Sequence, residues 1–171
     1  MRTCVLAMAV VGIGLWVTGA GAQNQSAGQD ESFLMKAVSA GAKEVKVSEH
    51  AEKNARNEQV KAFAKDLVKD HTKANKELLE HARGLKVAVA TGLEKDNKTK
   101  FDNLTKLTGA DYDREYIKMM IDDHKEAINL FETEARSGKN ADLKSFAEKT
   151  LPTLRQHLKH AEETMQALKQ K

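Results

Sequence analysis

Cysteine, proline and tryptophan are almost missing from this chain of 171 residues, which contains one of each. The single cysteine is Cys4, so the rest of the chain has no disulfide, no thiolate metal ligand and no cysteine nucleophile. A domain without cross-links must be held together by packing alone. The single proline, Pro152, leaves long stretches in which nothing interrupts a helix. These absences favour an all-α domain with a hydrophobic core of its own.

The first 22 residues have the pattern of a secretory signal peptide. Arg2 is followed by an apolar run from Val5 to about Val17, and small residues from Ala20 to Ala22 form an A-x-A-like cleavage site. The apolar run is shorter than the roughly 20 residues that a membrane-spanning helix needs, which argues against an N-terminal anchor. We therefore predict a signal peptide over 1–22, cleaved near Ala22, and a periplasmic or secreted mature protein.

The charge pattern excludes one large class of partners. The formal net charge is +3, and removal of Arg2 leaves 27 basic and 25 acidic residues, a net charge of +2. Because both signs alternate along the chain, there is no clustered basic patch of the kind that binds nucleic acid. Beyond residue 22 no apolar run approaches the length of a transmembrane span. The sequence identifies no protein partner.

Apolar residues recur with the 3.6-residue period of amphipathic helices. After a polar, flexible tail over 23–30, this period predicts a folded domain over 31–171 with long helices near 31–55, 58–83, 111–136 and 140–169. Asp30, Asn57 and Asn140 are placed to cap the first, second and fourth of these helices. A long connection follows Gly84 and includes a short helix near 98–107. Four long helices with one long crossing connection predict a four-helix bundle.

Each long helix has one ionisable residue on its apolar face: Glu44, His71, His124 and His157. Burying such groups is costly unless they are paired or bound to a metal. One carboxylate and three imidazoles on facing helices provide a complete ligand set for a divalent metal such as Zn²⁺ or Cu²⁺. The same four groups also make a plausible buried hydrogen-bond network, and the pattern leaves both interpretations open.

Two aspartates directly precede histidines on the predicted helices. Asp70 precedes His71, and Asp123 precedes His124. One residue along a helix is a rotation of about 100°, so neither aspartate shares the direction of its neighbouring histidine. We expect both at the edge of the core, where each accepts a hydrogen bond from an imidazole of another helix.

Motifs for common enzyme chemistry are missing from the sequence. There is no G-x-S-x-G nucleophile turn and no glycine-rich phosphate loop. The paired E-x-x-H motifs of di-iron bundles are also missing, since Glu49, Glu52 and Glu77 are not followed by histidine three residues later. The motifs therefore favour a binding protein over an enzyme.

Four segments resemble a known bacterial family, the domain of unknown function 4142 (DUF4142). They are "AGAKEVKVSEHA" (40–51), "NEQVKAFAKDLVKDH" (57–71), "DYDREYIKMMIDDHKEAINLF" (111–131) and "LPTLRQH" (151–157). The resemblance implies a secreted protein with a ferritin-like four-helix fold, of a kind often labelled an outer membrane protein, and it implies no activity. The family pattern has a Glu in the first helix, Asp-His in the next two and His after Leu-Pro. These match Glu44, Asp70–His71, Asp123–His124 and His157.

The sequence thus predicts an exported four-helix protein that binds or buffers a divalent metal through a buried Glu/His cluster. The alternative is a non-enzymatic structural or stress-related interaction module, in which the same cluster is only a hydrogen-bond network. The two repeats of [V/I]-x-D-H-x-x-A, at 68–74 and 121–127, also suggest that the chain contains two related helical hairpins.

Overall fold

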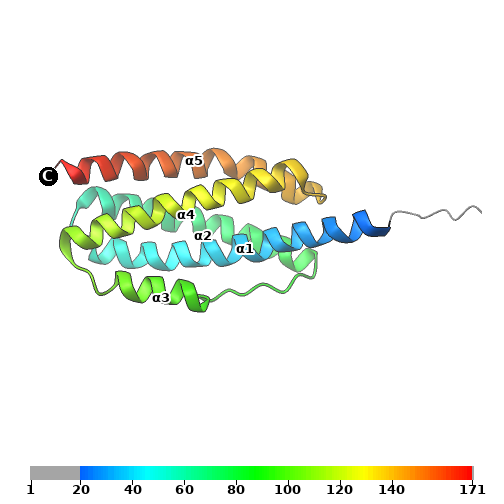
Figure 1. Cartoon of the computed structure of the whole chain (residues 1–171), viewed down its shortest axis with the longest axis horizontal. Coiled ribbons are helices and arrows are strands. Elements are labelled where there is room, and N and C mark those ends of the chain that lie inside the picture. The colour runs from blue at the N-terminus through cyan, green and yellow to red at the C-terminus, as the bar shows by residue number, and fades with distance from the viewer. Residues whose placement is uncertain (1–19, 171) are drawn as a thin grey trace, which may run out of the picture.

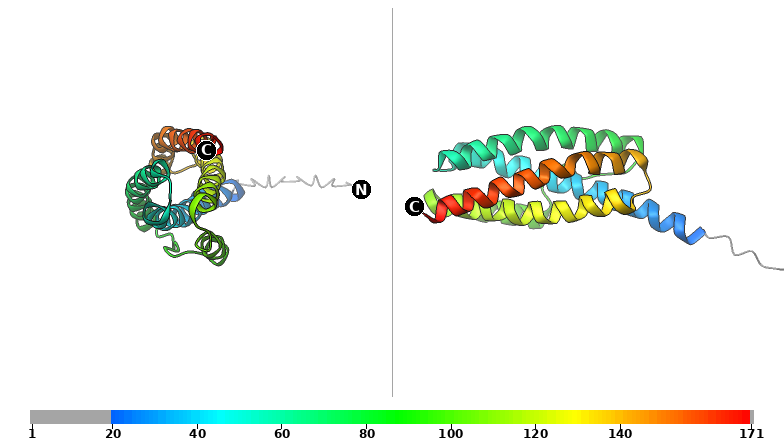
Figure 2. Two further views of the ribbon diagram at one scale, coloured as in Figure 1. Left: turned by 90° about the vertical axis from the view of Figure 1, so that its left-hand side faces the viewer. Right: turned by 90° about the horizontal axis from the view of Figure 1, so that it is seen from above.

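A computed structural model describes residues 20–170, and the part of the predicted signal peptide over 1–19 lies outside these described residues. The helices are α1 (Ala20–Asn54), α2 (Glu58–Gly84), α3 (Lys95–Leu104), α4 (Gly109–Ser137) and α5 (Ala141–Lys169). Four long helices surround a common core, and α3 lies against the outside of the bundle (Figures 1 and 2). The predicted all-α four-helix bundle with a long connection is confirmed.

The long helices form two antiparallel hairpins, α1–α2 and α4–α5 (Figure 1). The connection between them contains α3 and runs back along the bundle, so that α4 begins beside the α1–α2 turn. None of the helices in the described residues combines enough length with enough hydrophobicity to cross a bilayer.

Asparagine side chains begin the second helix of each hairpin, as predicted. Asn57 Oδ1 accepts a hydrogen bond of 2.9 Å from Gln59 N. Asn140 Oδ1 accepts bonds of 3.0 Å from the main-chain nitrogens of Asp142 and Leu143. Each cap satisfies N–H groups that have no partner within the first turn of the helix.

Aspartates tie each hairpin turn to the opposite hairpin. Asp113 of α4 accepts two hydrogen bonds of 2.9 Å, from Arg56 N and Asn57 N in the α1–α2 turn. Asp30 of α1 accepts two bonds of the same length from Lys139 N and Asn140 N in the α4–α5 turn. Both carboxylates are buried. These reciprocal contacts hold the two hairpins in a fixed register along the bundle axis.

A constant offset of 83 residues relates the two hairpins. It relates Asp30 to Asp113 and Asn57 to Asn140, and it aligns "NEQVKAFA" (57–64) with "NADLKSFA" (140–147). The predicted repeat of 68–74 and 121–127 instead compares α2 with α4, which hold different places in their hairpins. The 83-residue alignment therefore supports two related hairpins. The motif shared by 68–74 and 121–127 does not support them, because it compares helices that are not equivalent.

The start of the bundle differs from the prediction. Helix α1 begins at Ala20, so the residues expected to form a tail over 23–30 are helical, and Asp30 lies inside α1 rather than at its cap. No proline or β-branched residue interrupts this segment, and its polar residues are compatible with a helix. The short helix α3 also begins three residues earlier than the predicted start at residue 98.

The α4–α5 turn brings two acidic side chains together. Glu134 is 1% exposed and lies close to Asp30. Burial first, and then the neighbouring charge of Asp30, raise the pKa of Glu134 to about 7. The chain passes so close to Glu134 at Gly138 that a Cβ there would collide with the Glu134 side chain and carbonyl oxygen. Glycine is therefore required at this turn for steric reasons.

The first prediction tests the reciprocal aspartate contacts. Asp113→Ala leaves Arg56 N and Asn57 N without their acceptor, and we expect the free energy of unfolding to fall by about 1–3 kcal/mol. Asp111→Ala is the matched control, because Asp111 is an exposed aspartate in the same turn of α4. It should change stability by no more than about 0.5 kcal/mol. Urea unfolding gives the free energy of unfolding of both variants. Equal losses of stability would contradict a stabilising role for the Asp113 contacts.

The second prediction concerns the pH dependence of stability at Glu134. A folded-state pKa of about 7, above the ordinary 4.5, means that the folded protein holds this proton more tightly than the unfolded chain. The stability that the proton provides is complete below pH 4.5 and is lost as pH rises through about 7. We therefore expect Glu134→Gln to raise the free energy of unfolding by roughly 1–3 kcal/mol at pH 8. Thermal unfolding at pH 4 and pH 8 checks this, and an equal gain at both values would contradict it.

Candidate metal centre

A polar layer divides the bundle core into two apolar clusters. The cluster nearest the α1–α2 turn includes Val47, Phe63, Tyr116 and Ile117. The cluster nearest the α4–α5 turn includes residues such as Phe33, Leu78, Phe131, Phe146 and Leu154. The polar layer lies between them on every long helix, and its members are Glu44, His71, His124 and His157, all of which are buried. The structure therefore brings together all four residues that the helical period selected.

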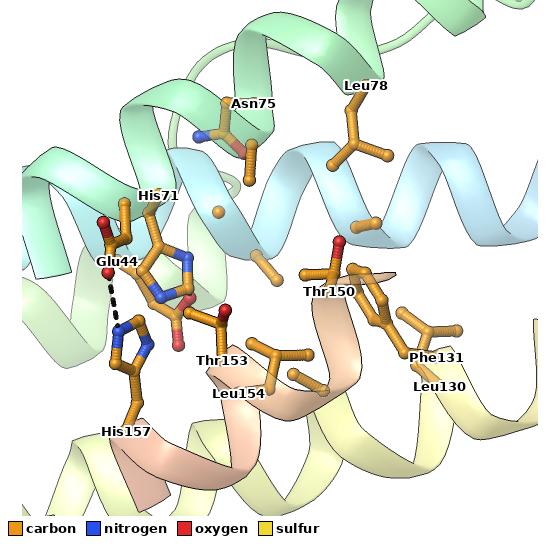
Figure 3. Close-up of a pocket in the computed structure, with 16 residues that line it drawn as sticks. Glu44, His71, Asn75, Leu78, Leu130, Phe131, Thr150, Thr153, Leu154 and His157 are labelled. Carbon is orange, nitrogen blue, oxygen red and sulfur yellow. Dashed lines mark hydrogen bonds and ion pairs between the residues drawn. The ribbon is translucent and has the colours of Figure 1, made fainter. Parts of the chain in front are cut away.

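The three imidazoles form a nearly equilateral triangle. The ring centroids of His71 and His124 are 5.5 Å apart, those of His71 and His157 are 5.5 Å apart, and those of His124 and His157 are 5.4 Å apart. One nitrogen from each ring lies within 4.8 Å of the other two. Figure 3 shows His71 and His157 approaching each other from α2 and α5.

One nitrogen of each imidazole is held by an acceptor. His71 Nδ1 donates to Glu44 Oε2 at 2.9 Å, and His157 Nε2 donates to Asp70 Oδ2 at 3.1 Å. His124 Nδ1 lies 2.8 Å from the main-chain oxygen of Met120, which can only accept, so this nitrogen carries the proton. All three acceptors fix both the tautomer and the orientation of a ring, as the partners of metal-bound histidines do.

The other nitrogen of each imidazole has no hydrogen-bond partner. His71 Nε2, His124 Nε2 and His157 Nδ1 are buried and unpaired. In a neutral imidazole whose first nitrogen donates, the second nitrogen presents a lone pair. When all three rings are neutral, three such lone pairs in one buried triangle repel one another and satisfy none of their bonding capacity. A cation at the centre of the triangle would satisfy all three.

The ionisable groups of the triangle have pKa values that are shifted in different directions. Burial alone would raise the pKa of Glu44, but the neighbouring His71 and His124 outweigh it and lower that pKa to about 2. Burial alone would lower the pKa of His71, but its contact with Glu44 raises it above the ordinary value. Burial, and then the charges of His71 and His124, lower the pKa of His157 to about 4. At neutral pH, Glu44 is ionised and His157 is neutral.

The two predicted aspartates have different partners. Asp70 contacts the imidazole of a neighbouring helix, at His157. Asp123 differs from the prediction, because its Oδ1 lies 2.6 Å from Lys43 Nζ and accepts a hydrogen bond there rather than from an imidazole. Lys43 is buried and reaches Asp123 from α1 across to α4. From the sequence alone, a lysine next to Glu44 is expected at the surface. The helical period therefore does not predict the Lys43–Asp123 pair.

The arrangement suits a three-histidine metal site. Zn²⁺ bonded to nitrogen at 2.0–2.1 Å in tetrahedral geometry places its ligand nitrogens about 3.4 Å apart. The observed separations of up to 4.8 Å require small inward movements of the rings. Glu44 holds the outer nitrogen of His71, and the two nitrogens of one ring point in different directions. Glu44 therefore cannot keep this contact and also reach a metal on the inner nitrogen.

The remaining histidines lie outside this centre. His160 is exposed, and His50 is half-buried, with its Nδ1 2.8 Å from the hydroxyl of Tyr112. Phe101 of α3 makes an edge-to-face contact with the His50 ring. His81 lies near the end of α2 against Phe146.

Comparisons with known proteins agree with this architecture. A crystal structure of a DUF305 fragment from Deinococcus radiodurans superimposes with a TM-score of 0.72 at 12% sequence identity. The match covers 81% of this chain and 96% of that fragment, and at this identity it shows the fold alone. A search of curated proteins found no match.

The family model of a domain of unknown function, DUF4142, matches residues 16–164. This range contains Glu44 and all three histidines of the buried centre. It also covers the reciprocal Asp30 and Asp113 contacts that join the hairpins. The chain belongs to the DUF4142 family.

Proposed function

We propose that this protein binds and buffers a divalent metal, Zn²⁺ or Cu²⁺, through His71, His124 and His157. The observation that carries the proposal is the set of three buried, unpaired nitrogens within one triangle. Each ring is already oriented by an acceptor at its opposite nitrogen, so the inner nitrogens are prepared to bind a cation. Imidazole nitrogen suits both metals.

The second candidate is a non-enzymatic structural or interaction module whose buried cluster only forms hydrogen bonds. The contacts of His71 with Glu44 and of His157 with Asp70 favour this candidate. However, a completed buried network satisfies its polar atoms. This cluster leaves three imidazole nitrogens without a hydrogen bond, which supports metal binding over the network alone.

We further propose that the protein acts after export, in the periplasm or outside the cell. Support comes from the sequence pattern over 1–22, with its apolar run and small residues before the predicted cleavage site. The intact mass of the protein purified from its native host tests this proposal. A chain that begins near Gln23 is expected, and a mass that includes Met1 would contradict cleavage.

The metal prediction compares two histidine variants. The unmodified protein should bind about one Zn²⁺ or Cu²⁺, and a metal concentration 100 times the Kd should stabilise it by about 2.7 kcal/mol. For a domain of this size, that corresponds to a rise in Tm of roughly 5–10 °C. His124→Ala should abolish tight binding and the rise in Tm. His160→Ala is the control and should retain both, because His160 is exposed.

Calorimetric titration and thermal unfolding, on protein without a histidine tag, provide the two measurements. If Tm is the same with and without Zn²⁺ and Cu²⁺, metal binding is excluded and the hydrogen-bond network remains. In that case His124→Ala should still lower stability, because His124 is completely buried and donates to Met120.

A further inference from the structure

A partly open cavity of about 50 Å³ adjoins the histidine triangle (Figure 3). His71 and His157 form one side of the cavity, with Glu44 and Asp70 beside them. The rest of the wall is largely hydrocarbon, and includes Ala37, Ala74, Leu78, Ala127, Phe131 and Leu154. The cavity therefore extends from the polar layer toward the apolar cluster near the α4–α5 turn.

The position of this cavity matters because three histidines leave one position of a tetrahedral metal free. Glu44 is held behind His71 and does not fill that position. His71 and His157 line the cavity, whereas His124 does not. The free position of such a metal lies on one side of the plane of its three ligands, and the cavity lies on the side of the triangle that faces the apolar cluster near the α4–α5 turn.

We propose that the free position takes a small ligand of a few heavy atoms, with one donor atom on the metal and the others in the apolar cavity. This inference rests on the proposed metal binding. The small size follows from the volume of the cavity, about 50 Å³. The hydrocarbon wall disfavours a ligand whose far end needs hydrogen bonds.

The structure also indicates a route of entry. A second hollow lies on the outside of the bundle between α2 and α5, and it shares Asp70, Ala74, Thr150 and Thr153 with the inner cavity. These shared residues are the wall between the two spaces. Three of them have short side chains, so modest movements of α2 against α5 would admit a small molecule.

The experiment uses the full chain loaded with Co²⁺, whose visible absorption reports the number and type of its ligands, and azide as the three-atom probe. We expect azide to change the spectrum saturably. Ala74→Leu and Thr153→Leu each add bulk to the shared wall, from α2 and from α5, and each should weaken azide binding at least tenfold. Ala62→Leu is the matched control on the exposed face of α2, and its azide affinity should stay within twofold of the unmodified protein.

The amount of bound Co²⁺ separates the two proposals. If the unmodified protein binds no Co²⁺, Zn²⁺ or Cu²⁺, the proposed metal binding fails and this inference fails with it. If Co²⁺ binds but azide leaves the spectrum unchanged, the free position is closed and only this inference is overturned. Equal azide affinities in all four proteins, with full Co²⁺ loading, would also overturn it, because the ligand would then lie outside the cavity.

Discussion

The hydrogen bonds on the outer side of the histidine triangle determine what the centre of this bundle can do. Glu44, the Met120 carbonyl and Asp70 each accept a hydrogen bond from one imidazole. An acceptor on one nitrogen leaves the other nitrogen as a lone-pair donor. In their neutral form, the three rings therefore present the same chemical face to one point. Their acceptors differ, because one is a buried carboxylate, one is a main-chain oxygen and one is a half-buried carboxylate.

This arrangement has a cost that the rest of the fold must offset. A buried layer of ionisable groups interrupts the apolar core, and each desolvated group without a complete set of partners destabilises the folded state. Two apolar clusters lie on either side of the layer. Beyond them, Asp30 and Asp113 tie the ends of the hairpins together, each through two main-chain N–H groups of the opposite hairpin. The register that these aspartates fix is also the register that brings four separate helices to one polar layer.

The sequence was sufficient to place residues on helix faces, because the helical period is a local property. Glu44, His71, His124 and His157 shared the phase of their apolar neighbours, and all four are buried in one layer. Asn57 and Asn140 were found as caps for the same local reason. Contacts between helices could not be predicted from the sequence in this way. Which imidazole nitrogen faces inward depends on acceptors from other helices or on a main-chain oxygen, and neither has a pattern in the sequence.

Asp30 and Lys43 show the same limit. Asp30 has the residue type of an N-cap and does accept bonds from main-chain N–H groups, but those groups belong to the α4–α5 turn rather than to α1. Lys43 pairs with Asp123 of α4, a residue 80 positions away in the chain. In both cases the chemistry of the side chain was predictable and its partner was not, because the partner depends on how the hairpins pack.

The relation between the two hairpins explains why the cavity lies beside the histidine triangle. Under the 83-residue offset, Glu44, His71, His124 and His157 correspond to Ala127, Leu154, Gly41 and Ala74. All four of these equivalents line the cavity. The bundle therefore has two related layers at its middle, one filled with long polar side chains and one with Leu, Ala and Gly. Exchange of large groups for small ones leaves unfilled volume where neighbouring side chains cannot collapse into it. The Glu/His layer and the cavity are thus two halves of one pseudo-symmetric core, in which equivalent helix positions carry polar side chains on one side and leave space on the other.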